Sequence, residues 1–548
     1  MQTKLSKPPT YPALPLPAAK RDHAPLTSTL HDQDVKFVFD DKYYDLVTWD
    51  GPNDPANPQN WSKGYKWFLT MICSFMSISM ASSAPSAASN SIATEFNVSY
   101  EISVLITTLF QCGYVVGPIL WGPGSELVGR RPIFLSTMVA FTLLHLGQSL
   151  APNMTTLLVT RFLAGFFGAA PLSNCAAVIF DIWPVVGRGA ATAIIITSVF
   201  FGTAVGPVLG SFITESSLGW RGLFWIIMIY PAICTVLASL LLPETYAPVL
   251  LQQKAKRLRA TDPITNRFIY TEHETHDWSL KGVLHRTLYR PFYMLANEPI
   301  LMLVTAFLSL ENGILYGLFE AIPVIFTEKR DFSVFQAGLI FCGVGVGTFI
   351  GAILSIYLDG NTPEVINKWQ GFPPPENRLY GALVGGPCLI TGIFWLGWAG
   401  EYPSVPWYIP ALSTIPIGAS ITLVFISFSA YLLDTYLMYS ASAIAASVMV
   451  RSCIGAVFPL FTLQMLTKMG INWAATLLGL IGLLLTCGLF LFFKFGSRIR
   501  SRSKFAPCFD ISMAKTYEDH KLNVGVQVLG RVVIRGAVHT KVSWIDLS

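Results

Sequence analysis

The chain has 548 residues and a formal net charge of +5, and 52% of its residues are hydrophobic while only 13% are charged. Soluble domains carry roughly a quarter charged residues, so the composition argues against a soluble enzyme, a disordered protein and a nucleic-acid-binding protein. A membrane-spanning helix needs ~20 mainly apolar residues, and the mean hydropathy of +0.52 agrees with a chain built largely of such helices.

The chain begins with a segment that we expect to stay outside the membrane. Residues 1–65 are rich in Pro and charge and contain no short apolar core typical of a cleavable signal. The first hydrophobic run starts near Trp67, and we expect it to act as the insertion signal.

Twelve apolar runs follow, in two groups of six separated by a polar stretch. This duplicated arrangement is typical of transporters, so we predict an all-α polytopic membrane protein with two six-helix halves. The predicted spans are 66–92, 101–122, 132–151, 156–179, 189–213 and 223–242 in the first half (66–242), and 299–326, 335–358, 379–400, 407–431, 440–467 and 471–495 in the second half (299–495). A central loop, 243–298, and a C-terminal tail, 496–548, complete the chain.

Lysine and arginine set the predicted orientation. The central loop, the turns after the second and fourth spans and the tail are basic, whereas the turns 93–100 and 401–406 carry neither residue type. Basic segments stay on the cytoplasmic side, so both termini and the central loop are predicted to be cytoplasmic. The sequons at Asn97 and Asn153 then fall on outside turns and are predicted glycosylation sites.

The turn between the second and third spans combines one acid with two arginines. It contains Gly122, Glu126, Gly129, Arg130 and Arg131. Glycines permit a tight turn, and a carboxylate can pair with an arginine in one conformation and release it in another. We interpret the turn as a charge latch at the cytoplasmic gate; the alternative is a basic turn with an incidental acid.

The next cytoplasmic turn offers a second pair of opposite charges. Asp181 and Arg188 bracket the turn after the fourth span. They are candidates for a second latch, and two solvated side chains are the alternative.

Two further features lie inside predicted spans. Arg161, in the fourth span, is costly in hydrocarbon unless it faces a cavity or a partner, and we favour a cavity-facing role over snorkelling to the outer surface. The fifth span carries Gly202, Gly206, Pro207 and Gly210, which give one flat helix face for close packing and a bend at the proline.

Together these features resemble the major facilitator superfamily, specifically its twelve-span drug:proton antiporters. The Gly122–Arg131 turn is similar to the family's loop 2–3 signature, Leu158–Gly165 to its fourth-span arginine motif, and Gly202–Gly210 to its fifth-span antiporter motif. Pro243–Pro248 and Asp434–Tyr436 are similar to fungal members that export drugs, polyamines or secondary metabolites.

The resemblance implies a proton-coupled exporter of small hydrophobic or weakly cationic compounds, not an enzyme. Two halves would rock about a central site, driven by the proton gradient and without a cofactor. It also implicates Arg161 in proton transfer, and Glu126 with Arg130 and Arg131 in conformational switching. We expect a monomer in the plasma membrane. The vacuolar membrane, import, polyamine or other metabolite transport, and a non-transporting sensor stay open as alternatives.

Proton coupling needs a carboxylate within the membrane, and the first span has none. Glu311 lies near the middle of the seventh span, and Glu320 lies roughly two turns further out. An intramembrane acid is a functional candidate by default. We hypothesise that Glu311 carries the proton and that Arg451, in the eleventh span, is its partner or a substrate contact. A structural hydrogen bond to another helix is the alternative.

Other polar residues within the spans are predicted to line the cavity. They are Gln111, Tyr114, Asn174 and Tyr316, for which simple hydrogen bonds between helices are the alternative. No metal site is expected, because the nine cysteines form no CxxC pair and the loop sequence beginning at His273 is one residue short of HExxH. No GxxxxGK[ST] motif occurs, which argues against an ATP-driven pump. We assign no function to residues 524–548.

Overall fold

The computed structural model describes residues 45–78, 80–184, 187–261, 269–275, 279–360 and 374–506. Residues 524–548 therefore lie outside the described residues, as does His276 of the loop sequence that is one residue short of HExxH. The chain divides into two compact units, Met1–Asp45 and Leu46–Ser548. All of the described helices belong to the second unit.

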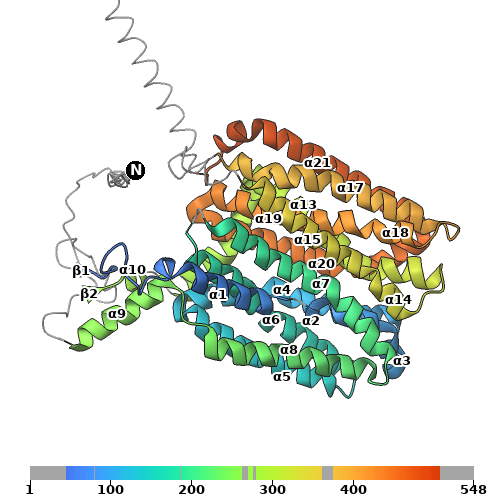
Figure 1. The fold of residues 1–548 in the computed structure, drawn as a ribbon, viewed down its shortest axis with the longest axis horizontal. Coiled ribbons are helices and arrows are strands. Elements are labelled where there is room, and N and C mark those ends of the chain that lie inside the picture. The colour runs from blue at the N-terminus through green and yellow to red at the C-terminus, as the bar shows by residue number, and fades with distance from the viewer. Residues whose placement is uncertain are drawn as a thin grey trace, which may run out of the picture. The chain divides into compact units, whose positions relative to one another are not determined.

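The first group of helices, the N-terminal bundle, runs from residue 63 to residue 241 (Figure 1). Its elements are α1 (Lys63–Met76), α2 (Met80–Ser83), the 3₁₀ helix η2 (Ala84–Ala88), α3 (Ser89–Phe96), α4 (Tyr100–Val128), α5 (Arg130–Ser149), α6 (Met154–Ile182), α7 (Arg188–Glu215) and α8 (Gly219–Leu241). A short 3₁₀ helix, η1 (Pro58–Asn60), and the two-residue strand β1 (Asp45–Leu46) precede it.

The second group, the C-terminal bundle, is built in the same way. Its elements are α13 (Pro299–Ile322), η5 (Pro323–Glu328), α14 (Val334–Leu339), α15 (Phe341–Leu358), η6 (Pro375–Leu379), α17 (Tyr380–Glu401), α18 (Tyr408–Leu412), α19 (Thr414–Tyr436), η7 (Leu437–Tyr439), α20 (Ser440–Met469) and α21 (Ile471–Arg500).

A linker of short elements joins the two bundles. It contains α9 (Ala247–Thr261), β2 (Ile269–Tyr270), α10 (Glu272–Thr275), α11 (Leu280–Leu284), the π-helix η4 (His285–Tyr289) and α12 (Arg290–Asn297). We call the end of the bundles beside these elements the linker end, and the opposite end, with α3 and α14, the distal end; α9 and α10 lie at the left of Figure 1, and α3 and α14 at the right.

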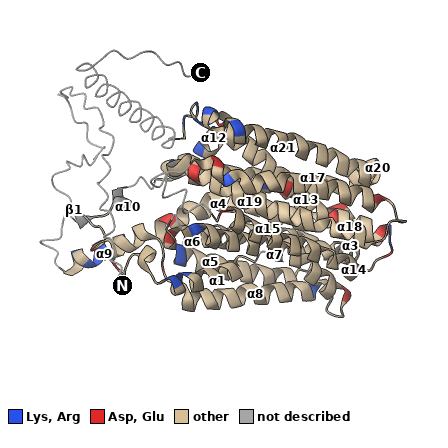
Figure 2. Cartoon of the chain, turned by 45° about the horizontal axis from the view of Figure 1, so that its top comes forward, with Lys and Arg blue, Asp and Glu red and all other residues tan. Residues whose placement is uncertain are grey.

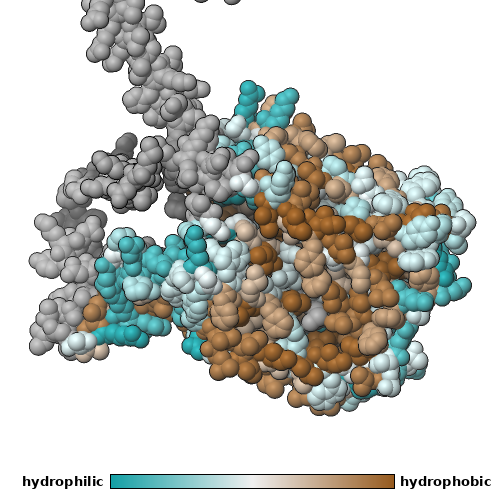
Figure 3. All heavy atoms as spheres, viewed as in Figure 1, coloured by the Kyte–Doolittle hydropathy of each residue, from teal (hydrophilic) through white to brown (hydrophobic). Residues whose placement is uncertain are grey.

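Ten helices of the described chain are long and apolar enough to cross a membrane, and they coincide with ten of the predicted spans. Large apolar side chains are exposed along α8, α15 and α21, for example Val236, Ile353 and Leu484. Figure 3 shows this apolar surface in brown, with hydrophilic residues towards the two ends, and Figure 2 shows most charged residues at those ends. The prediction of an all-α polytopic membrane protein is confirmed.

The two remaining predicted spans differ in outcome. The run 132–151 forms α5, whereas the run 66–92 is broken into α1, α2, η2 and α3 instead of one helix. The break has two visible causes. Pro85, in η2, has no backbone N–H to donate, and the carbonyl oxygen of Ala84 faces α7, where a Cβ on Gly210 would lie only 2.2 Å from it.

Buried apolar side chains form two separate cores, one for each bundle. Helix α7 is shared, because Ala193, Ile196, Phe200 and Ala204 belong to the core of the C-terminal bundle. The bundles meet along two helix pairs, α4 with α20 and α7 with α15. Polar groups buried along these pairs are therefore placed between the two bundles.

The approach of α7 to η2 can be tested by substitution. Gly210→Val puts side-chain atoms where even a Cβ would overlap the carbonyl of Ala84, and overpacking costs ~1–3 kcal/mol. We expect a lower midpoint of thermal unfolding in detergent. Gly189→Val is the matched control on the same helix, because a Cβ there meets nothing within 4 Å. Equal midpoints for the two variants would contradict the close approach.

Candidate transport site and gates

Arg161 lies on α6 and is fully buried between helices of the N-terminal bundle. Its Nε donates a hydrogen bond of 3.0 Å to the carbonyl oxygen of Ile106 on α4, and its guanidinium carbon lies 4.3 Å from the centre of the Phe110 ring. Close packing of α4 on α6 makes these contacts possible, because a Cβ at Gly165 would lie 2.0 Å from the Phe110 carbonyl oxygen. The side chain therefore stays inside the bundle and does not snorkel to the surface.

Glu311 lies in the middle of α13, and only 2% of the residue is exposed. The Ser420 hydroxyl on α19 donates a hydrogen bond of 2.9 Å to Oε1. The other oxygen, Oε2, is buried and accepts no hydrogen bond from the described residues. A carboxylate with one neutral donor is costly as an anion away from water, so the described residues leave this acid without the partners that a buried anion needs.

The backbone of Arg451 contacts Asn312, the residue after Glu311, but the Arg451 side chain does not pair with Glu311 in the described chain. The Asn312 side-chain amide donates to the backbone carbonyl of Arg451, at 2.9 Å. The Arg451 guanidinium carbon lies instead 4.7 Å from the centre of the Phe425 ring on α19, and the described residues hold no ion pair between Glu311 and Arg451. The hypothesised partnership is thus absent from this conformation, and Arg451 remains a candidate substrate contact.

The predicted cavity residues lie along α4, α6 and α13. Gln111 and Asn174 are 2% and 1% exposed, and Gln111 Oε1 and Asn174 Nδ2 have no hydrogen-bond partner within the described residues. Tyr114 packs its ring on Phe110 with 4.9 Å between centroids, and Tyr316 is 4% exposed. Buried polar atoms without a protein partner are the groups that a bound molecule or ordered water satisfies.

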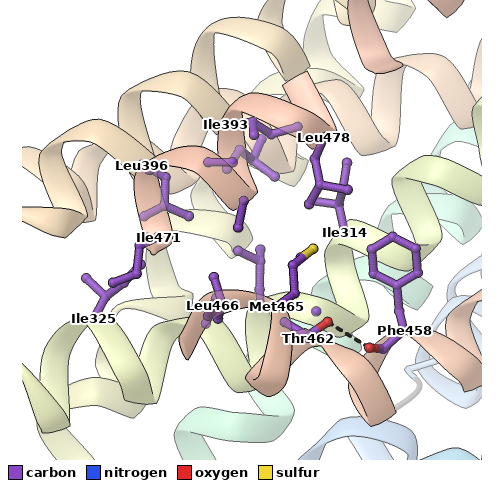
Figure 4. Close-up of a pocket in the computed structure, with 17 residues that line it drawn as sticks. Ile314, Ile325, Ile393, Leu396, Phe458, Thr462, Met465, Leu466, Ile471 and Leu478 are labelled. Atoms are coloured by element: carbon purple, nitrogen blue, oxygen red, sulfur yellow. Dashed lines mark hydrogen bonds between the residues drawn. The ribbon is translucent and has the colours of Figure 1, made fainter. Parts of the chain in front are cut away.

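A separate apolar pocket lies inside the C-terminal bundle (Figure 4). It has a volume of about 50 Å³, and its lining residues come from α13, η5, α17, α19, α20 and α21. The Thr462 hydroxyl in its wall donates to the Phe458 carbonyl at 2.7 Å. None of the predicted site residues lines it, so the pocket does not mark the predicted transport site.

At the distal end, the two bundles are in direct contact. The Tyr100 hydroxyl at the start of α4 donates a hydrogen bond of 2.7 Å to Glu320 Oε2 on α13. The rings of Phe212 on α7 and Phe335 on α14 lie 5.5 Å apart. Glu320, which the sequence marks as the second acid of α13, therefore belongs to a closed distal contact, outside the middle of the bundle.

At the linker end, the partners of Arg130 differ from Glu126, the partner predicted from the sequence. Its Nε lies 3.2 Å from the Asp181 carboxylate at the end of α6, and its Nη1 donates to the Ser125 hydroxyl at 2.6 Å. The backbone amides of Arg130 and Arg131 donate to Glu244, at 3.0 and 3.1 Å. We call Ser125, Arg130, Asp181 and Glu244 the linker-end cluster.

The expected ion pair between Glu126 and an arginine is absent among the described residues in this conformation. The backbone carbonyl of Glu126 instead lies 2.9 Å from His273 Nε2 in the linker. The expected Asp181–Arg188 pair is also absent, since Arg188 donates to the carbonyls of Phe180 and Trp183. A cation at the C-terminal end of a helix, here α6, is favourable by itself, which frees Asp181 for Arg130.

The predicted turn is also shorter than its sequence indicates. Helix α4 continues to Val128, so Gly122 lies within the helix and a Cβ there would meet nothing within 4 Å. Gly129 alone requires glycine, because its φ is +110° and a Cβ would lie 2.4 Å from Glu244 Oε2. The sequence marks Glu244 only through the Pro243–Pro248 stretch, which resembles fungal members of the family.

Both sequon asparagines are exposed at the distal end. Asn97 ends α3 in the left-handed conformation, with a φ of 52°, which asparagine adopts more readily than most residues. Asn153 begins α6, and its Oδ1 accepts a hydrogen bond of 2.8 Å from the Thr156 amide. Their glycosylation stays a prediction.

Two helical bundles with buried charges between membrane-crossing helices define a membrane transporter, not an enzyme. The chain belongs to the major facilitator superfamily, because the family model described as Major Facilitator Superfamily matches residues 67–459.

Fungal transporters are similar over most of the chain. The MFS-type transporter acdC of Aspergillus candidus is 40% identical over 85% of this chain and 91% of that protein. The MFS-type efflux pump MFS2 of Trichophyton rubrum is 38% identical over 86% and 79%, and the citrinin biosynthesis cluster MFS transporter mrr1 of Monascus ruber is 38% identical over 84% and 92%. The resemblance to the fungal exporter branch is confirmed.

Solved structures share the fold at low identity. A proton:xylose symporter bound to 6-bromo-6-deoxy-D-glucose superposes with a TM-score of 0.57 and 17% identity, over 79% of this chain and 97% of that chain. The human organic anion transporter MFSD10 gives a TM-score of 0.53 and 15% identity, over 79% and 99%. These likenesses confirm the fold class.

The linker-end cluster predicts an energetic coupling between Arg130 and Asp181. In a double-mutant cycle of Arg130→Gln and Asp181→Asn, we expect a coupling of ~0.5–3 kcal/mol, as for side chains in direct contact. Thermal or denaturant unfolding in detergent measures it. The matched cycle of Arg130→Gln with Glu126→Gln should be additive in this conformation, because no ion pair joins these side chains in the described chain. Coupling only in the second cycle would show that Glu126 is the partner.

Proposed function

We propose that the protein is a proton-coupled exporter in which inward proton movement drives a small molecule outward. One observation carries the proposal. The Glu311 carboxylate is buried in the middle of a membrane-crossing helix, where the described residues supply one neutral hydrogen-bond donor and leave one oxygen without a partner. An acid in this position is costly unless a proton, water or a cation reaches it.

Alternating access links this acid to transport. We propose that residues 66–242 and 299–495 rock as two halves about the region between α4, α6, α13 and α20. With the distal end closed by the Tyr100–Glu320 contact, Glu311 is occluded as a neutral acid. Loss of its proton leaves an anion that a weakly cationic substrate can neutralise, so proton and substrate compete for one carboxylate.

The predicted cavity residues support a hydrophobic or weakly cationic substrate. Gln111 and Asn174 supply neutral polar atoms that have no partner among the described residues, and Tyr114 and Tyr316 supply rings with a polar tip. Arg161 is already engaged with Ile106 and Phe110. Drugs, toxins and secondary metabolites of this chemistry are the proposed cargo. The similarity to the citrinin-cluster transporter supports the secondary-metabolite class.

The proposal also covers the charge contacts at the linker end and the orientation of the protein in the membrane. We propose that the contacts of Arg130 with Asp181 and Glu244 hold the linker end of the N-terminal half together in this conformation, and that Glu126 engages Arg130 or Arg131 in another conformation. We propose a monomer in the plasma membrane with both termini cytoplasmic. The exposure of both sequon asparagines at the distal end is compatible with this orientation.

Proton coupling can be tested in vesicles containing the purified protein and a labelled amphipathic drug. An imposed pH gradient should drive drug accumulation, and a protonophore should abolish it, because the gradient is the only energy source. Accumulation that is equal with and without the gradient would overturn the antiporter proposal.

The role of Glu311 can be tested in the same vesicles. Glu311→Gln keeps the shape of the side chain but cannot lose a proton, so we expect gradient-driven accumulation to fall to the protonophore level and binding of a cationic drug to weaken. Glu328→Gln is the matched control, because this acid is exposed at the end of η5. Glu320→Gln tests the other acid of α13; loss of coupling there, with normal coupling in Glu311→Gln, would transfer the role to Glu320.

A further inference from the structure

The linker carries an apolar surface on the side that faces away from the bundles. Five large side chains of α11, η4 and α12 remain between 39% and 60% exposed, although they belong to a polar loop of the sequence. They are Leu284, Leu288, Tyr289, Phe292 and Tyr293. We call this surface the linker patch.

The patch is built from two rows of side chains along nearly continuous helix. Residues four apart lie on one helix face, which aligns Leu284, Leu288 and Phe292. Beside them, the ring of Tyr289 stacks on His285 with 5.1 Å between centroids and on Tyr293 with 5.8 Å. The result is a continuous apolar strip with polar ring tips, the composition typical of helices that lie in a membrane interface.

The opposite face fixes this helix to the protein. Pro291 and Met294 are buried, and α12 packs against α13 and α20. The Arg290 Nε donates a hydrogen bond of 2.9 Å to the Ser442 hydroxyl of α20. These contacts fix the orientation of α12, so the linker patch stays exposed on the other side of the helix.

The position of the patch places it at the level where the membrane begins. Helix α12 ends at Asn297, and α13, a candidate membrane span, begins at Pro299. Aromatic side chains with polar tips are enriched at this level of a bilayer, at the boundary between headgroups and acyl chains.

The exposed charge around the patch is positive. Lys281 precedes it by one turn, and Arg498, Arg502 and Lys504 are exposed at the end of α21 and just beyond. The Phe505 ring lies 6.1 Å from Tyr293, which brings this segment beside α12. Figure 2 shows basic residues gathered near α12 and the adjoining end of α21.

The acids near these cations do not cancel their charge at the surface. Glu298 is 2% exposed, and its carboxylate accepts from the Lys504 amide and the Tyr436 hydroxyl. Glu376 is engaged by the buried Arg500, at 2.8 Å. An apolar strip with exposed cations matches acyl chains below and anionic headgroups above.

We infer that the linker patch binds anionic phospholipids of the leaflet at the linker end. The leucines and rings enter the boundary of the acyl chains, and Lys281, Arg498, Arg502 and Lys504 attract the headgroups. Because η4 contacts both α4 and α20, bound lipid holds the linker against both bundles at once. This inference goes beyond the proposed transport function and does not depend on it.

Amide hydrogen exchange of the full-length protein in lipid nanodiscs tests the inference. Nanodiscs contain phosphatidylcholine alone or phosphatidylcholine with phosphatidylserine. We expect slower exchange of residues 280–297 with phosphatidylserine, and loss of this difference at high salt, which screens exposed charges. Native mass spectrometry should show phosphatidylserine retained by the protein, with binding weaker by about fivefold for each basic residue removed.

Matched variants distinguish a specific lipid-binding site from general electrostatic attraction between the protein and anionic lipid. Lys281→Gln with Arg502→Gln should remove the phosphatidylserine effect, whereas Lys256→Gln with Arg257→Gln, which removes the same charge from exposed positions on α9, should leave it unchanged. Leu288→Ser with Phe292→Ser should speed exchange of residues 280–297 in both lipids. Equal protection in both lipids, or equal losses in both charge variants, would overturn the inference. So would protection that persists in detergent without lipid, since residues 507–548 or a second copy would then cover the patch.

Discussion

The cost of placing a charge away from water governs this structure more than any other interaction. Charged side chains make up only 13% of the chain, and most lie at the two ends of the bundles. Those inside are satisfied by the protein: Arg161 by a carbonyl and a ring, and Arg130 by Asp181 and Ser125. Glu311 Oε2 and Arg451 Nε, in contrast, are buried without a hydrogen-bond partner in the described chain. The cost of buried charge is therefore the reason why Glu311 is the acid on which the proposed proton coupling rests.

Close packing of helix backbones makes this arrangement possible. Where α4 meets α6 and α7 meets η2, glycines bring backbones so near that a Cβ would overlap the neighbouring carbonyl, as at Gly165 and Gly210. The first contact delivers the Ile106 carbonyl to Arg161. The second holds the broken helix at Ala84 against α7, which also contributes to the core of the C-terminal bundle. The close packing of the helices therefore also determines which polar groups contact each other in this protein.

Hydrophobic periodicity predicts the fold well because each membrane helix must satisfy its own backbone and face lipid with apolar side chains. It fails where tertiary contacts decide the outcome. The break in the run 66–92 follows from Pro85 together with the contact of η2 with α7, and the helical state of Gly122 follows from continuation of α4 to Val128. Individual buried residues such as Glu311 stand out in the sequence, since any intramembrane acid does. Their partners do not: Asp181 and Glu244 come from segments distant in sequence from Arg130, and only the folded chain joins them.

Two acids on α13 connect the middle of the protein to its distal end. Glu311 and Glu320 belong to one helix, but Glu311 accepts from Ser420 within the C-terminal bundle, whereas Glu320 accepts from Tyr100 of the other bundle. Opening the distal end must break the second hydrogen bond and admit water along the same helix that carries the first acid. A neutral Glu311 is compatible with the closed arrangement, and an ionised one requires access to water or a cation. In the proposed mechanism, opening of the distal contact and a change of charge at Glu311 would be linked through α13, as coupling a proton to a conformational change requires.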